Sequence, residues 1–188
     1  MNEWVVSSKD LHIPTPFRMT VSGPSGSGKT MWIQRFINNN ELIINGKFDI
    51  VMFVYGEYQR LFDKIKKDNP GIIWCEGFCY ETISNTLDVK GLKKLLIIDD
   101  LLQEVADDSF FHTFYVRRSH HWDVSIIFTT QYLHQKGLRL VNLNTTHYVM
   151  FKTFRDQTAV RTLALQIFPR NWRKFMEIYS HATRYVYE

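Results

Sequence analysis

Six short runs of apolar and β-branched residues alternate along the chain with longer amphipathic stretches. Their length, and the turn residues that bound them, are typical of β-strands. The runs cover residues 17–22, 49–55, 72–74, 95–98, 124–129 and 146–151. The second and the fourth are almost continuously apolar, as expected of strands that are buried on both faces of a parallel sheet.

The stretches between these runs predict helices. One follows the Gly-rich turn after the first strand and ends at Asn38, and the others cover residues 57–67, 81–87, 109–118, 157–166 and 172–181. Strands that alternate with helices, without an internal repeat, predict an α/β domain whose sheet is mainly parallel. A chain of 188 residues can bury roughly 70% of its unfolded surface in one such domain.

Composition narrows the class of protein. Hydrophobic residues make up 45% and aromatic residues 15% of the sequence, which excludes a disordered chain. No apolar stretch reaches the roughly 20 residues of a membrane helix, and the N-terminal segment has neither the basic nor the apolar part of a secretory signal. Cys75 and Cys79 supply at most half of a zinc site, so we assign no metal to them. We expect an intracellular globular protein without a membrane span.

Charge is distributed unevenly along the chain. Residues 1–116 contain 12 Lys and Arg against 15 Asp and Glu, whereas residues 117–188 contain 11 against 4. A positive field around the C-terminal part would raise the affinity for a polyanion such as nucleic acid. Ordinary solvated helix faces explain the same charges equally well, so both interpretations stay open.

The segment between the first strand and the first helix matches the phosphate-binding pattern G-x-x-x-x-G-K-[ST] in full. It reads Gly23, Pro24, Ser25, Gly26, Ser27, Gly28, Lys29 and Thr30. Between a strand and a helix, such a loop surrounds phosphates with backbone N–H groups and adds the positive end of the helix dipole. We expect Lys29 to bridge the β- and γ-phosphates of ATP and the Thr30 hydroxyl to hold Mg²⁺.

Two carboxylates follow the buried run at residues 95–98. Asp99 and Asp100 stand at the C-terminal end of that strand, at the edge where open α/β sheets bind ligands. We expect Asp99 to complete the Mg²⁺ shell and Asp100 to polarise the attacking water as general base. A solvated strand end or a helix N-cap has the same pattern, but the loop upstream favours the nucleotide role.

The remaining strands refine this interpretation. Along the chain, at least one strand, at residues 49–55, lies between the strand before the Gly-rich phosphate-binding loop (the P-loop) and the strand that ends in Asp99 and Asp100. This spacing fits the division of P-loop proteins that has an inserted strand and an adjacent catalytic acid. The run at 124–129 ends at Thr129 and is followed by Thr130 and Gln131. A polar side chain there, beside the P-loop strand, predicts Gln131 as a γ-phosphate sensor, and an ordinary strand-end residue is the alternative.

With these motifs in order, the sequence resembles the FtsK–HerA superfamily, specifically the genome-packaging ATPases of large DNA viruses, virophages and Polinton or adintovirus-like elements. The resemblance covers most of the chain from residue 16 to about residue 183. The matching segments are residues 23–30, 95–101, 117–121, 125–131, and 151–156 continuing to 168–169. One departure is Asp100, because many members have Glu at that position and Asp is one methylene shorter.

The resemblance implies an ATPase that assembles into a homo-oligomeric ring and moves double-stranded DNA, independently of its sequence, into a preformed capsid. A capsid protein or the portal vertex would be the partner, in an infected host cell or virion. It implies a three-layer domain with core order 5-1-4-3-2, in which residues 1–15 are an N-terminal extension and residues 16–188 a single P-loop ATPase domain. Lys29, Thr30, Asp99 and Gln131 carry over in the roles given above.

Several basic residues are candidates for contacts with a neighbouring subunit or with DNA. Ring ATPases commonly place an Arg of one subunit at the nucleotide of the next, and the candidates near strand boundaries are Arg117, Arg118 and Arg155. Each of them could equally be a surface or DNA-facing charge. The residues available to meet DNA phosphates are Lys136, Arg139, Arg170, Arg173 and Lys174.

Two other functions use the same motifs. A nucleotide or small-molecule kinase would cradle ATP in the loop and orient an acceptor hydroxyl with the acid. A non-catalytic assembly or membrane-docking factor would bind the nucleotide as a switch. The adjacent carboxylates and the basic C-terminal part favour the motor over both.

Overall fold

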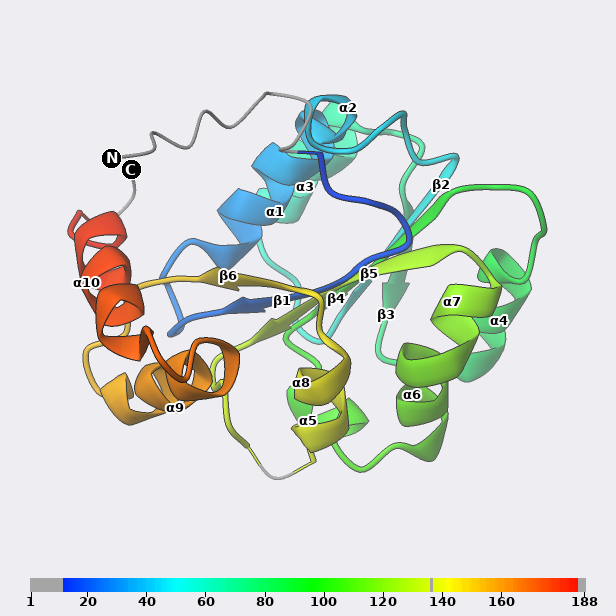
Figure 1. Ribbon diagram of the computed structural model, residues 1–188. Helices are drawn as coiled ribbons and strands as arrows, with labels where there is room; N and C mark the ends of the chain where they lie inside the picture. Colours follow the sequence, from blue (N-terminus) through cyan, green and yellow to red (C-terminus); the bar gives the residue numbers. More distant parts are fainter. Residues whose placement is uncertain (1–11, 136, 186–188) are drawn as a thin grey trace.

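Six strands form one sheet in which every pairing between the described residues is parallel (Figure 1). The computed structural model describes residues 12–135 and 137–185. The sheet has the order β3-β2-β4-β5-β1-β6. The strands are β1 (Arg18–Ser22), β2 (Ile50–Tyr55), β3 (Ile73–Glu76), β4 (Lys94–Asp99), β5 (Val124–Thr130) and β6 (His147–Met150).

The strand order confirms the expected core. With β3 set aside as an additional edge strand, the other five strands follow the order 5-1-4-3-2. As this order requires, β5 lies between the P-loop strand β1 and the acidic strand β4. β2 pairs with the far side of β4. Helical crossovers allow a chain to return on either side of a strand, so order along the sequence does not fix order in the sheet.

Helices cover both faces of the sheet (Figure 1). One face carries α1 (Lys29–Asn38), α2 (Asn40–Ile43) and α3 (Leu61–Asp68), and these pack on Leu95 and Ile97 of β4. The other face packs on Leu96 and Ile98, because successive side chains of a strand point to opposite faces. The helices of that face are α4 (Tyr80–Leu87), α5 (Leu102–Val105), α6 (Ser109–Thr113), the π-helix η2 (Phe114–Arg118), α7 (Ser119–His121) and α8 (Arg139–Asn144).

The last two helices form a separate layer at the β6 edge. α9 (Gln157–Ile167) and α10 (Trp172–Ala182) pack on each other around Val160, Leu163 and Tyr179. The Tyr179 hydroxyl donates to the Phe151 carbonyl at 2.9 Å and accepts from the Thr153 N–H at 3.0 Å. These bonds fasten the helix pair to the segment that leaves β6, close to the end of the P-loop strand.

Several predicted boundaries move in the structure. The helix expected at residues 57–67 begins at Leu61, because the segment before it turns over the end of β4. The helix expected at 109–118 is divided into α6 and η2. Of the expected N-terminal extension, residues 1–11 lie outside the described residues, and Ile13 forms a parallel bridge with Ile44. None of the described helices combines the length and apolar character needed to cross a bilayer.

Candidate nucleotide-binding site

The Gly-rich loop joins β1 to α1 at the carboxyl edge of the sheet. Gly26 and Gly28 have φ of 73° and 99°, a left-handed backbone that glycine adopts without strain. Gly23 has a different constraint, because a Cβ atom there would lie 2.5 Å from Cβ of Phe151 and 2.7 Å from Oγ of Ser27. The glycines therefore allow the chain to turn tightly and to pack against the end of β6.

The Lys29 side chain folds back onto the loop and binds its backbone. Its Nζ donates to the carbonyl oxygens of Gly23 at 2.7 Å and Pro24 at 3.0 Å. Burial lowers the pKa of Lys29, and the negative charges of Asp99 and Asp100 act in the opposite direction. The ammonium group thus lies within the loop and can exchange its carbonyl partners for the oxygens of a bound anion.

Asp99 is buried at the end of β4, with 2% of its surface exposed. Its Oδ1 accepts from the Thr129 hydroxyl at 2.8 Å, and its Oδ2 lies 3.4 Å from both Thr30 Oγ1 and Gln59 Nε2. Burial raises the pKa of Asp99, while the Thr129 bond and the positive charge of Lys29 oppose that rise. The sheet therefore holds one carboxylate beside the first turn of α1.

The pairing of Thr30 and Asp99 suits Mg²⁺. Both are oxygen donors, and Mg²⁺ is usually held by one or two protein oxygens together with waters and substrate phosphates. Within the described part of the chain, no three or more His, Cys, Asp or Glu side chains gather as a metal cage. A magnesium ion here would be bound jointly by the protein and its substrate.

Asp100 and Gln131 lie at the exposed mouth of the site. Asp100 has φ of 57°, and its N–H donates to Thr129 Oγ1 at 3.0 Å. Gln131 Nε2 donates to Asp100 Oδ1 at 3.4 Å. Thr129 therefore binds both acids, which leaves the Asp100 side chain directed to solvent and to Gln131.

Two hollows flank the loop. The first, here called the phosphate cleft, has a volume of about 490 Å³ and contains the polar groups described above. Its lining residues are Ser25, Gly26, Gly28, Lys29, Thr30, Met31, Glu57, Tyr58, Gln59, Leu61, Asp99, Asp100 and Gln131. One cleft thus gathers five of the predicted site residues, namely Lys29, Thr30, Asp99, Asp100 and Gln131.

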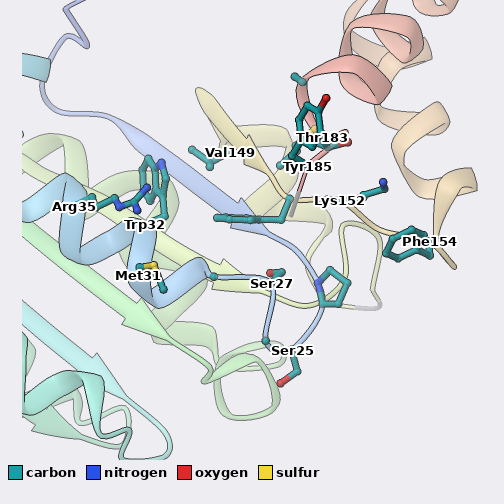
Figure 2. A pocket seen from close by; sticks show the side chains of 16 residues that line it. Ser25, Ser27, Met31, Trp32, Arg35, Val149, Lys152, Phe154, Thr183 and Tyr185 are labelled. Carbon is teal, nitrogen blue, oxygen red and sulfur yellow. The ribbon is translucent and has the colours of Figure 1, made fainter. Parts of the chain in front are cut away.

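The second hollow, here called the aromatic pocket, lies on the other side of the loop and has a similar volume of about 490 Å³ (Figure 2). Met31, Trp32 and Arg35 of α1 form one wall. Figure 2 shows Phe154 from the segment after β6 and Tyr185 from the segment after α10 on the opposite side. Sequence reasoning did not find this pocket, because its walls come from three segments far apart in the chain.

The predicted arginines occupy different edges of the sheet. Arg155 is exposed at the carboxyl edge, next to Phe154 of the aromatic pocket. Arg117 and Arg118 lie at the opposite edge, since the guanidinium of Arg18, at the start of β1, donates to the carbonyl of Val116 at 3.1 Å. Arg117 and Arg118 therefore cannot reach the Gly-rich loop or the phosphate cleft of the same chain.

The predicted DNA contacts lie on the C-terminal part of the structure. Arg170 precedes α10, while Arg173 and Lys174 lie in its first turn. The guanidinium of Arg173 stacks over the Trp172 ring, with 4.7 Å to the ring centroid. Arg139 begins α8, and Lys136 lies outside the described residues.

No protein-family model and no curated protein matches this chain. Among solved structures, it is similar to the genome packaging NTPase B204 from Sulfolobus turreted icosahedral virus 2, in complexes with AMP and with ATP-gammaS. The TM-scores are 0.55 and 0.54 at 15% and 17% identity, over 84% of this chain and 85% of that chain. Flagellar accessory protein FlaH from Methanocaldococcus jannaschii gives 0.51 at 15% identity, over 73% and 72%. At these identities the likeness shows the fold, which is of the P-loop NTPase type.

Replacing Thr129 tests whether its hydroxyl holds the two acids. Thr129→Val keeps the β-branched shape but leaves Asp99 Oδ1 and the Asp100 N–H without that partner, so we expect a loss of about 1–3 kcal/mol in the free energy of unfolding. Urea denaturation measures the loss, and Thr129→Ser, which keeps the hydroxyl, is the control. A Val variant as stable as the Ser variant would show that the hydroxyl does not support the site.

Proposed function

We propose that this protein binds and hydrolyses ATP, and that hydrolysis drives the movement of double-stranded DNA. The observation that carries the proposal is a single cleft in which Lys29 and Thr30 of the loop face Asp99 and Asp100. A loop of backbone N–H groups with a lysine recognises phosphates, and neighbouring carboxylates hold a divalent cation and polarise water. This combination fits a nucleoside triphosphate bound with Mg²⁺.

Each residue has a definite part in the proposed reaction. The loop N–H groups and Lys29 bind the β- and γ-phosphates, and Thr30 and Asp99 hold Mg²⁺, which when bound neutralises phosphate charge. Asp100 and Gln131 line the mouth of the cleft, where they would face the γ-phosphate. There Asp100 positions the attacking water, and Gln131 contacts the γ-phosphate and reports its presence.

The aromatic pocket is a suitable place for the base of ATP. Ser25, Gly26, Gly28 and Met31 line both this pocket and the phosphate cleft, so the two hollows meet across the loop. A nucleotide with its phosphates on the loop can extend its base between α1 and the Phe154 side of the pocket. Base stacking on aromatic side chains is favourable for any base, so the pocket favours a nucleotide without fixing its identity.

The finer part of the proposal, a packaging motor of the FtsK–HerA type, has three supports. The sequence resembles that superfamily, the fold is like that of a viral genome packaging NTPase, and residues 117–188 have a large excess of basic side chains. In a homo-oligomeric ring, Arg155 at the nucleotide edge is the candidate for contact with a neighbouring subunit's ATP. Arg117 and Arg118, at the other edge, are candidates for contact with DNA or the next subunit. A capsid protein or the portal vertex would receive the DNA.

Turnover measured with and without duplex DNA, over a range of protein concentrations, tests this function. We expect DNA of any sequence to raise turnover, because backbone phosphates attract the basic surface, and added salt to weaken the effect steeply. Specific activity should also rise with protein concentration as subunits assemble. Lys29→Ala should abolish turnover throughout, since the phosphates lose their lysine.

The same experiment separates the alternatives. Activity of a monomer that ignores DNA would favour a nucleotide or small-molecule kinase. ATP binding without turnover would favour a nucleotide-dependent assembly factor. Either result would exclude the motor.

The two acids should differ in their effects. Asp99→Asn should weaken Mg²⁺-dependent ATP binding, because a neutral amide is a poorer ligand for the ion. Asp100→Asn should leave ATP bound but slow its hydrolysis. Equilibrium binding with and without Mg²⁺, combined with single-turnover rates, distinguishes these effects. Equal changes in binding for both variants would contradict the division of roles.

The aromatic pocket can be tested without touching the phosphate cleft. Phe154 is 74% exposed, so Phe154→Ala should leave the fold intact while removing a surface for the base. If the ring stacks on the base, ATP affinity should fall by the equivalent of about 1–3 kcal/mol. Competition by inorganic tripolyphosphate, which has no base, should be unchanged. Phe168→Ala, another exposed ring that does not line the pocket, is the control.

A further inference from the structure

A third hollow adjoins the phosphate cleft next to Asp100. This outer hollow, of about 510 Å³, is lined by Gly56, Glu57, residues 100–104, Gln131, Tyr132 and Gln135. It shares three lining residues with the phosphate cleft, namely Glu57, Asp100 and Gln131. These three residues therefore border both hollows, and a triphosphate bound in the phosphate cleft would meet the solvent of the outer hollow past them. In phosphoryl transfer the attacking oxygen and the leaving oxygen are roughly in line, so the water enters from this side.

The backbone and side-chain contacts of Asp100 limit how far its carboxylate can move as a general base. Its backbone is fixed in a left-handed conformation by the bond to Thr129, and its Oδ1 already accepts from Gln131. Its side chain is also short, so its carboxylate cannot extend far from the strand end. Asp100 is therefore better placed to orient the attacking water, together with Gln131, than to take a proton from it in the transition state.

Glu57 is the other carboxylate at this border. The backbone before it is held to the acidic strand, because the Gly56 N–H donates to the Asp99 carbonyl at 3.1 Å. A Cβ atom on Gly56 would lie 2.7 Å from the Asp100 carbonyl oxygen, so the two chain segments are in close contact. Within residues 12–135 and 137–185, the Glu57 carboxylate has no hydrogen-bond or ion-pair partner. It is exposed, and it is longer than Asp100 by one methylene.

We infer that Glu57 is the general base of the proposed ATP hydrolysis, an inference that rests on the proposed function. The Glu57 carboxylate takes a proton from the attacking water as the water oxygen bonds to the γ-phosphorus. The bond from that phosphorus to the β–γ bridging oxygen breaks, and its electron pair leaves with ADP. The products are ADP and inorganic phosphate, and the proton held by Glu57 passes to solvent.

Glu104 provides a matched control for Glu57. It also lines the outer hollow, but it does not line the phosphate cleft. Its Oε2 accepts from the Phe78 N–H at 3.2 Å, and glutamine keeps an oxygen for that bond. Glu57→Gln and Glu104→Gln thus make the same chemical change in the same hollow, at one position that also lines the phosphate cleft and at one that does not.

The experiment compares ATP binding and single-turnover hydrolysis in the full-length wild-type protein and both Gln variants, with duplex DNA present. We expect Glu57→Gln to bind ATP as the wild-type does, to retain it intact, and to hydrolyse it at least about 100-fold more slowly, the usual minimum for loss of a general base. Glu104→Gln should match the wild-type. Added formate should restore part of the turnover to Glu57→Ala, because a small carboxylate can fill the space left by the side chain.

The outcomes separate the two levels of the hypothesis. If the wild-type hydrolyses ATP and Glu57→Gln behaves like Glu104→Gln, Glu57 is not the base, while the proposed function stands. If Glu57→Ala is slow and formate does not restore turnover, a role as base is likewise overturned. If the wild-type binds ATP but never hydrolyses it, the proposed function fails, and the role of Glu57 fails with it.

Discussion

The hydroxyl of Thr129 is the link on which the geometry of this site depends. It donates to the buried carboxylate of Asp99 and accepts from the N–H of Asp100, so one side chain of β5 fixes both acids of β4. The bond is possible because β4 and β5 are paired in parallel with Ile98 beside Phe128. β5 also pairs with β1, where the Gly23 N–H donates to the Thr130 carbonyl at 3.1 Å. A single central strand thus holds the acids and the loop in one register.

Electrostatics explains why such a site is ready for an anion. Burial disfavours the charged forms of both Lys29 and Asp99, which raises the pKa of the acid and lowers that of the lysine. Each group is partly compensated by the other's charge, and Lys29 is further stabilised by the carbonyls of Gly23 and Pro24. A phosphate with its cation would supply both groups with closer partners of opposite charge. The loop and the acidic strand therefore hold an arrangement that binding would complete rather than rebuild.

Sequence patterns predicted most of the fold, and the limits of that prediction have physical reasons. The buried strands have a self-contained apolar signal, so β2 and β5 were located to within a residue, and the loop has fixed spacing. The helices α2 and α5 were missed because each has four residues, too few for an amphipathic period to appear. The role of Thr129 depends on strand register, which no local pattern specifies. Glu57 follows a buried strand as the two Asp do, and that position was the one available signal for it.

Helix α10 has the aromatic pocket at its C-terminal end and basic residues at its N-terminal end. Thr183 and Tyr185, which follow α10, line the aromatic pocket, and Tyr179 of the same helix bonds to the segment that leaves β6. Arg173 and Lys174 lie at the other end of α10. Under the proposed function, a base that enters or leaves the pocket changes the contacts at one end of a helix whose other end meets DNA. A rigid helix passes such a displacement along its length, so under this proposal α10 would couple the aromatic pocket to the DNA contacts.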